Sequence, residues 1–245
     1  MPVRPATYAD LLPASKFLAK AFEDEYLFGE YMHPHRKEYP GDFYLTFLRN
    51  FLRIPYVSGA MDAILVSYKE NEQGQEQVTG IAVWKRNSAH PGSKSLFATA
   101  KIRAMEWYNN YFEPFLCPNR AIDPSRQSIL GDNWPFIQHH WTGSRAEVWD
   151  LALLGVDPSQ GGQGFGKELV SWGLEKAKGE GVGCSVVSAE GKEGFYERCG
   201  FTIVGTVRDE GGDENPMNRH KIRGGTILFW DNGRDLSGVK KYGES

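Results

Sequence analysis

The chain has 245 residues, which is enough for one large domain or two small ones. Its hydrophobic fraction of 40% and charged fraction of 24% are typical of a soluble globular protein. A formal net charge of −3 argues against nucleic acid as the main partner, and no run approaches the roughly 20 apolar residues of a membrane helix, so we expect neither nucleic acid nor a membrane as partner.

The cysteine pattern and the N-terminal residues both bear on the cellular compartment. Cys117, Cys184 and Cys199 are odd in number and widely spaced, which is typical of reduced thiols. The segment 1–5 lacks the apolar stretch of a signal peptide. These features predict a cytoplasmic protein, with the nucleus as the other possible compartment.

The first third of the chain predicts two helices followed by a β-hairpin. Thr7 is a suitable helix cap with Asp10 three residues later, and apolar residues follow at helical spacing. A polar segment containing Gly74 separates two apolar runs. The expected elements are a helix over 8–22, a helix from about 42 to 53, and strands over 62–68 and 78–84.

Residues 87–145 have no simple periodicity. The part 101–112 favours a helix, and 119–145 is rich in Pro, Gly, Asp and Asn, so we expect it to be mostly loop. The many aromatic residues indicate a folded insertion that packs on the main domain. The aromatic run Trp107 to Phe115 is accordingly expected to be packing.

From residue 147 onward, strands and helices alternate, which predicts a mixed α/β domain. We expect a single domain over 1–245, with an insertion around 87–145 and a peripheral tail over 231–245. The predicted elements are a strand over 148–156, a helix over 166–178, a strand over 182–188, a helix over about 192–198, an extended segment over 201–207 and a strand over 226–230.

A glycine-rich loop joins the strand 148–156 to the next helix. Its glycines, at 161, 162, 164 and 166, allow a tight turn whose N–H groups point outward at the positive end of the helix dipole. Such a turn favours anions, above all phosphate. The loop therefore predicts a phosphorylated ligand at Gly162 to Lys167.

Three simpler interpretations compete for this loop. It matches the G-x-x-x-x-G-K pattern of phosphate-binding NTPase loops, but Glu168 stands where a Ser or Thr would bind Mg²⁺. A dinucleotide fingerprint would need a third glycine where the chain has Leu169. A plain turn between strand and helix is the remaining alternative.

The loop also resembles the pyrophosphate loop of coenzyme A in the GNAT superfamily of N-acetyltransferases. The family pattern V-x-P-x-[Y/H]-[Q/R]-x-x-G-x-[G/A]-x-x-L is in register with Val156, Pro158, Gly164, Gly166 and Leu169, and departs from it at Gly161. A second resemblance lies downstream, where residues 195–201 are similar to the family's [L/F]-Y-x-x-x-G-F signature. The resemblance covers roughly 3–84 and 147–207.

The resemblance implies a GNAT-type α/β fold, with a mixed, mostly antiparallel sheet flanked by helices. It also implies acetyl-CoA as cosubstrate, held partly by main-chain groups of the fourth strand, which splays from the fifth. The residues implied for cofactor binding are Leu153, Leu154 and Val156 on the strand and Gly161, Gly162, Gln163, Gly164, Phe165, Gly166 and Lys167 in the loop.

The implied reaction is acetyl transfer to a primary amine by direct attack in a ternary complex. Tyr196 is the candidate general acid, since a phenol is protonated at neutral pH and can donate to a leaving thiolate. Relatives often have an acidic residue where this chain has Ala152, so Asp150, on the same strand face, is the candidate base. Glu25 and Glu30, in the loop after the first helix, are further candidates for this role.

A non-catalytic domain that binds acyl-CoA as a sensor or scaffold is the alternative from another functional class. The four histidines at 33, 35, 139 and 140 lack ligands at metal spacing, so we expect no metal. The acceptor is expected to be a small-molecule or peptide amine. The sequence does not determine the acceptor's identity or the oligomeric state.

Overall fold

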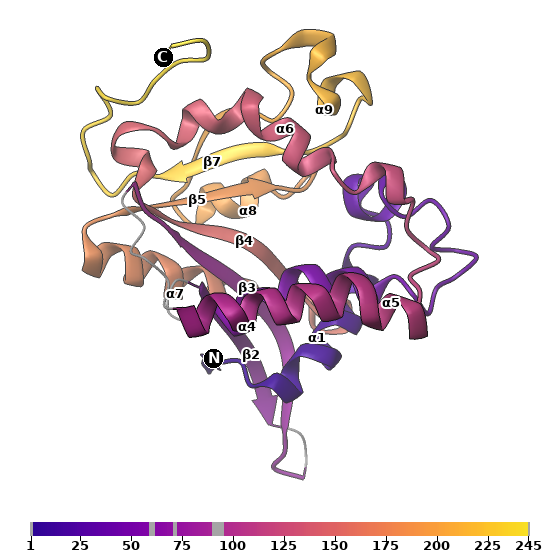
Figure 1. The fold of residues 1–245 in the computed structure, drawn as a ribbon. Helices are drawn as coiled ribbons and strands as arrows, with labels where there is room; N and C mark the ends of the chain where they lie inside the picture. The colour runs from indigo at the N-terminus through magenta and orange to yellow at the C-terminus, as the bar shows by residue number, and fades with distance from the viewer. Residues whose placement is uncertain (1, 59–61, 71–72, 90–95, 245) are drawn as a thin grey trace.

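The computed structural model describes residues 2–58, 62–70, 73–89 and 96–244, and these residues contain a seven-stranded sheet (Figure 1). The strand order is β1-β2-β3-β4-β5-β7-β6, and only the pair β4–β5 is parallel among the neighbours in this sheet. The strands are β1 (Val3–Pro5), β2 (Asp62–Glu70), β3 (Glu76–Asn87), β4 (Val148–Val156), β5 (Gly183–Ser188), β6 (Thr202–Thr206) and β7 (Thr226–Trp230).

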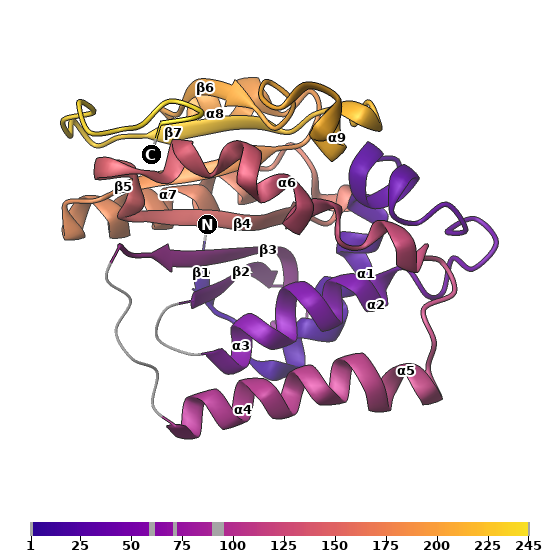
Figure 2. The ribbon, with the colours of Figure 1, turned by 45° about the horizontal axis from the view of Figure 1, so that its top comes forward.

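Helices cover both faces of the sheet (Figure 2). On one face, α7 and α8 enclose a core with Trp84 and Leu151 at its centre; on the other, α1 packs over β3 and β4, and α6 and α9 pack against β7. The helices are α1 (Tyr8–Ala21), α2 (Tyr44–Thr46), α3 (Ile54–Ser58), α4 (Leu96–Trp107), α5 (Glu113–Leu116), α6 (Ile129–Ile137), α7 (Phe165–Glu180), α8 (Glu193–Arg198) and α9 (Pro216–Arg219).

The elements expected around the glycine loop are confirmed. Strand β4 has the predicted bounds, and α7 ends where Gly181 adopts a left-handed conformation. The first helix is also confirmed, with a capping box in which the Thr7 N–H donates to the Asp10 carboxylate at 2.7 Å. The expected mixed, mainly antiparallel sheet flanked by helices is therefore correct.

The prediction that 119–145 is mostly loop is wrong. This segment contains α6 and three short 3₁₀ helices, Pro124–Arg126, Gln138–Trp141 and Gly143–Ala146. Pro135 lies inside α6, and local propensity does not favour a helix there. Tertiary packing overrides that preference, since Ile129 and Ile137 are buried against β7 and the buried Asn133 donates to the Val207 carbonyl.

The remaining helical segments are longer than expected. The predicted helix 42–53 continues through a π-helical segment, Phe47–Arg53, into α3. The predicted helix 101–112 begins at Leu96 and continues through a π-helical turn, Tyr108–Phe112, into α5.

The expectation that the aromatic run Trp107 to Phe115 is core packing is also wrong. Trp107, Tyr111 and Phe115 are exposed. Polar contacts hold the C-terminal half of this helical segment to the body of the protein: the Asn109 amide donates to the Arg49 carbonyl, and the Glu113 carboxylate accepts from Arg49 and Arg53.

Within the described ranges, no helix combines the length and the apolar character needed to cross a membrane.

Candidate functional site

The parallel strands β4 and β5 diverge in the middle of the sheet. Their pairing runs from Val148 opposite Gly183 to Leu151 opposite Val186 and ends there, although both strands continue. A bulge lies at the same level, because Val83 pairs with Leu153 and Trp84 with Leu151. Ala152 is thus the extra residue, and a bulge of this kind bends a strand and increases its twist. The divergence leaves main-chain groups of β4 available to a ligand.

The glycine loop lies at the carboxyl end of β4 and leads into α7. Gly164 caps the helix with φ +87°, in the left-handed region, and Gly162 has φ +76°. The first N–H groups of any helix lack intrahelical partners, so those of Phe165 to Lys167 are available to an anion. The loop is also tied to β2, because the Lys69 ammonium donates to the Gln160 side chain at 2.7 Å.

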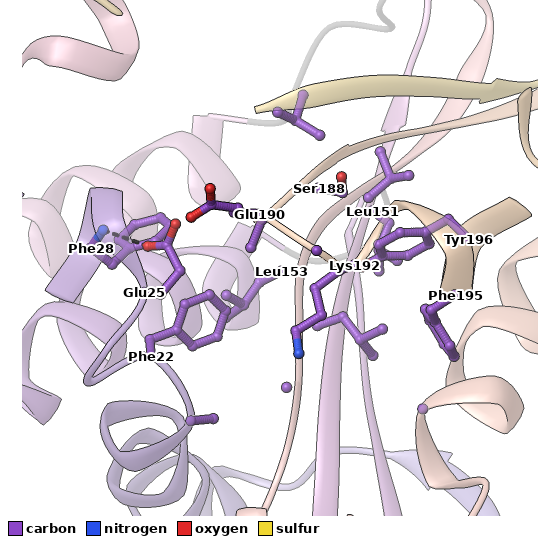
Figure 3. Close-up of a pocket in the computed structure, with 18 of the residues that line it drawn as sticks. Phe22, Glu25, Phe28, Leu151, Leu153, Ser188, Glu190, Lys192, Phe195 and Tyr196 are labelled. Atoms are coloured by element: carbon purple, nitrogen blue, oxygen red, sulfur yellow. Dashed lines mark hydrogen bonds between the residues drawn. The ribbon is translucent and has the colours of Figure 1, made fainter. Parts of the chain in front are cut away.

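A cavity of about 1120 Å³ runs from this loop through the gap between β4 and β5 (Figure 3). Its size suits an elongated ligand together with a second small molecule. The structure brings together on its wall every residue predicted for cofactor binding, and also the predicted acid: Leu153, Leu154, Val156, Gly161, Gly162, Gln163, Gly164, Phe165, Gly166, Lys167 and Tyr196.

Tyr196 lies on α8, where its ring packs in the core shared with Leu151 and Phe201 while lining the cavity (Figure 3). The Phe195 ring meets it edge-on at 5.0 Å between centroids. Burial raises the pKa of the Tyr196 phenol above its usual value of 10. The hydroxyl therefore stays protonated at neutral pH and can act as a proton donor.

Glu25 lines the same cavity from the loop that follows α1 (Figure 3). Its carboxylate accepts a hydrogen bond from the Phe28 N–H at 2.7 Å, capping the turn Tyr26–Tyr31. Burial raises the pKa of this carboxyl, and the negative charges of Glu190 and Glu30 raise it further. A carboxylate with a raised pKa inside a cavity is suited to accepting a proton.

Buried polar contacts hold the Glu25 loop in place. The His33 ring, which is fully buried, lies 2.5 Å from the Phe28 carbonyl through Nδ1 and 2.6 Å from the Thr46 hydroxyl through Nε2. Burial lowers the pKa of His33 to about 4, so the ring is neutral at physiological pH. The Arg36 guanidinium donates to the Glu23 carbonyl at 2.6 Å. His33 is thus a structural residue that supports the Glu25 loop.

Asp150 occupies a different place. It is not among the described residues that line the cavity. Its carboxylate accepts from the Ser185 hydroxyl at 2.6 Å, and the Trp141 indole N–H also donates to that hydroxyl. Burial raises the pKa of Asp150. Trp141 thus packs on this part of the sheet beside Asp150.

The sequence analysis missed three residues at the cavity. Ser188, at the end of β5, is 3% exposed, and its hydroxyl has no hydrogen-bond partner among the described residues. Glu190 forms an ion pair with Arg223 at 3.6 Å, and the Arg223 guanidinium lies over the Tyr26 ring at 4.5 Å. The position of Ser188 at the end of a predicted strand was a usable signal, whereas Arg223 lies in a loop without any sequence motif.

Among the described residues, no group of three or more His, Cys, Asp or Glu side chains has the arrangement of a metal site.

Comparison with known proteins adds evidence from sequence and from structure. A family model described as an acetyltransferase (GNAT) domain matches residues 134–203. A mycothiol acetyltransferase of Kocuria rhizophila is 28% identical over 172 residues, covering 64% of this chain and 55% of that protein. A mycothiol acetyltransferase of a Nocardioides species is 30% identical over 99 residues, covering 38% of this chain and 33% of that protein.

The chain thus spans about half the length, or less, of these curated relatives. Among solved structures, a Corynebacterium glutamicum protein described as histone acetyltransferase HPA2 and related acetyltransferase has a TM-score of 0.53. It is 16% identical, and the match covers 96% of this chain and 97% of that one, which supports the fold. The glycine loop and the diverging strands agree with these similarities: residues 134–203 match the acetyltransferase (GNAT) domain, and the chain is similar in sequence and in fold to acetyltransferases.

Proposed function

We propose that this protein transfers an acetyl group from acetyl-CoA to a primary amine by direct attack in a ternary complex. One observation carries the proposal: a single cavity joins the glycine loop, the gap between β4 and β5, a buried phenol at Tyr196 and a carboxylate at Glu25. The anion-binding end of the cavity suits the phosphates of an acyl carrier, and the proton-transfer end suits the reaction of its acyl group with an amine.

The residues present fit coenzyme A. The N–H groups of Phe165 to Lys167 would bind the pyrophosphate at the N-terminus of α7, beside the left-handed Gly164. Main-chain groups of β4 beyond Leu151 would bind the amide-containing arm of coenzyme A, since these groups no longer pair with β5. When bound, acetyl-CoA supplies the thioester that the amine attacks.

The amine must lose a proton and the departing thiolate must gain one. As the amine nitrogen bonds to the carbonyl carbon, the carbon–sulfur bond breaks and Tyr196 gives its phenolic proton to the sulfur. Glu25 takes the proton that the amine releases, either directly or through water. The raised pKa of Glu25 suits this role, because a base with a higher pKa accepts a proton more readily.

Asp150 is the second candidate for the base, and its role stays a prediction. Glu25 is the stronger candidate, because it lines the cavity whereas Asp150 is not among the lining residues. An Asp150→Asn variant tests the role. If Asp150 is a base that acts through water, the activity of the variant should no longer fall at acidic pH as that of the parent does. If Asp150 is structural, the pH profile of the activity should be unchanged.

The acceptor end suggests a cationic amine. Glu25 and Glu190 lie on the cavity wall, and a protonated amine would be attracted to them. Ser188 offers an unsatisfied hydroxyl for a polar group of the acceptor. The relatives are named for mycothiol, which agrees with a small-molecule acceptor; a peptide amine is the other candidate. Action in the cytoplasm, without nucleic acid or a membrane as partner, stays part of the proposal.

The competing proposal is a domain that binds acyl-CoA without turnover. Ala152 in place of a strand carboxylate and Gly161 in the loop favour it. Calorimetric titration with acetyl-CoA, followed by thiol release against a panel of amines, separates the two. Turnover with at least one amine supports the enzyme, binding without turnover supports the sensor, and failure to bind acetyl-CoA contradicts both.

A further inference from the structure

The helical segment from Leu96 to Leu116, which comprises α4, the turn Tyr108–Phe112 and α5, exposes large apolar side chains on its outward side. Every side chain of α4 is at least partly exposed. The side that faces the body carries the partly buried Ile102 and Met105, followed by Asn109 and Glu113, which bond to Arg49 and Arg53. Helices on a protein surface normally turn their apolar stripe toward the core. Here a second apolar stripe, which carries the large aromatic side chains, faces outward.

The outward side is apolar along its whole length. Leu96 is 90% exposed, Phe97 75%, Trp107 58%, Tyr111 70% and Phe115 87%. Ala100 and Ala104 lie on the same side and are also exposed, since positions three, four and seven apart share one face of a helix. We call these seven residues the outer stripe. Figure 2 shows α4 as the outermost helix beyond α3, at the end of the molecule opposite β6 and β7.

An exposed apolar surface of this extent is unusual for a monomer. At roughly 200 Å² for each aromatic side chain, the four exposed rings of the outer stripe present on the order of 600 Å². Leu96, Phe112 and Leu116 extend the surface to roughly 900 Å². Patches above a few hundred Å² mark interaction sites, and about 800 Å² per partner is the area of a standard stable interface.

The order of side-chain sizes indicates which partner fits. Small residues, Ala100 and Ala104, lie in the N-terminal half of the outer stripe, and large ones, Trp107 and Tyr111, lie in the C-terminal half. Two copies that pack antiparallel about a twofold axis near residues 105 and 106 would place Trp107 against Ala104 and Tyr111 against Ala100. The ends would then meet as Phe97 and Phe115. A twofold interface requires this kind of self-complementarity.

Charge argues against a lipid surface as the occupant. Helices that lie on membranes have a polar face rich in Lys and Arg. This segment has two cations, Lys101 and Arg103, and two acids, Glu106 and Glu113, and its polar side is bonded to the protein.

We propose that the outer stripe is a homodimer interface, in which the segment Leu96 to Leu116 packs antiparallel against the same segment of a second copy. The interface lies away from the cavity, so dimerisation is independent of the proposed function.

Sedimentation equilibrium of the full chain at micromolar concentrations tests the proposal. The parent protein is expected to be a dimer. Trp107→Glu and Tyr111→Glu each bury a charge in the interface and are expected to weaken dimerisation about tenfold or more. Leu236→Glu is the matched control, because it makes the same kind of change at an exposed position outside the segment, and it is expected to leave the dimer intact. Circular dichroism checks that each variant folds.

A size swap tests the antiparallel register. Ala104→Trp alone sets two large side chains against each other and is expected to abolish the dimer, whereas Ala104→Trp combined with Trp107→Ala is expected to restore it.

A parent that sediments as a monomer at all concentrations overturns the proposal, as does a dimer that tolerates both glutamates. A monomer that floats with phospholipid vesicles through Trp107 also overturns it, in favour of a membrane.

Discussion

The two ends of the cavity are built in different ways. At the glycine-loop end, the groups offered to a ligand are main-chain N–H groups at the start of α7, and the left-handed Gly164 sets the turn. At the opposite end the groups are side chains, Glu25, Ser188 and Glu190, which come from separate parts of the chain. The comparison teaches that the first end should tolerate loss of side chains but not of glycine, and that the second should depend on individual side chains.

The largest effect is expected from Tyr196→Phe. Removing the proton donor should lower kcat about 100-fold, within the usual range for general acid catalysis. Affinity for acetyl-CoA should change less than about threefold, because the ring and its packing remain. Steady-state kinetics and calorimetry measure the two quantities. Tyr242→Phe, at an exposed site in the tail, is the control. A kcat equal to the parent's would mean that Tyr196 is not the acid.

Glu25→Gln is expected to lower kcat/KM roughly tenfold to 100-fold at neutral pH. In the parent, activity should fall as pH decreases through the raised pKa of Glu25, since protonation removes the base. The variant should lack that acidic limb of the profile, whereas Glu30→Gln, at an exposed carboxylate, should retain it. An unchanged acidic limb in the Gln variant would exclude Glu25 as the base.

The same variant has a stability signature. A carboxyl whose folded pKa is raised favours the folded state when protonated, at low pH, and that contribution is lost as pH rises through the folded pKa. At neutral pH the ionised Glu25 therefore costs stability, and the Gln variant should have a Tm equal to or above that of the parent. Thermal unfolding at neutral pH measures this. A clearly lower Tm would indicate that Glu25 serves the fold.

Gly164→Ala tests the main-chain end. A side chain at φ +87° costs about 1–2 kcal/mol, and moving the loop to relieve that strain would misplace the N–H groups at the start of α7. Acetyl-CoA affinity is expected to fall about tenfold by calorimetry. Gly179→Ala in the same helix, where an added Cβ has open space, should bind normally. Equal losses in the two variants would contradict the assigned role of the loop.

The smallest effect is expected from Gln163→Ala. The Gln163 side chain contacts the Gln160 side chain at 3.2 Å in an exposed position, so its loss leaves the loop's main-chain groups in place. Acetyl-CoA affinity should stay within about threefold of the parent. A loss comparable to that of Gly164→Ala would remove the distinction between the two ends of the cavity.

The accuracy of the sequence-based prediction differs between two segments of the chain. The segment from Val148 to Phe201 was predicted closely, because its strands and helices are set by local periodicity and its turns by glycine. The segment 119–145 was misassigned as loop, because α6 owes its stability to contacts of Ile129 and Asn133 with β7 and the Val207 region. The local pattern of residues along the chain does not reveal such long-range contacts.

The site shows the same limit. Sequence alone determined the glycine loop, the strand before it and Tyr196, because the spacing of these residues along the chain is itself the signal. Only the tertiary structure decided that Glu25 and Ser188 share the cavity with Tyr196, that Asp150 lies outside it, and that the aromatic residues of α4 and α5 face outward. The physical reason is that burial and proximity depend on which distant segments pack together, and no residue's immediate neighbours in the chain specify that.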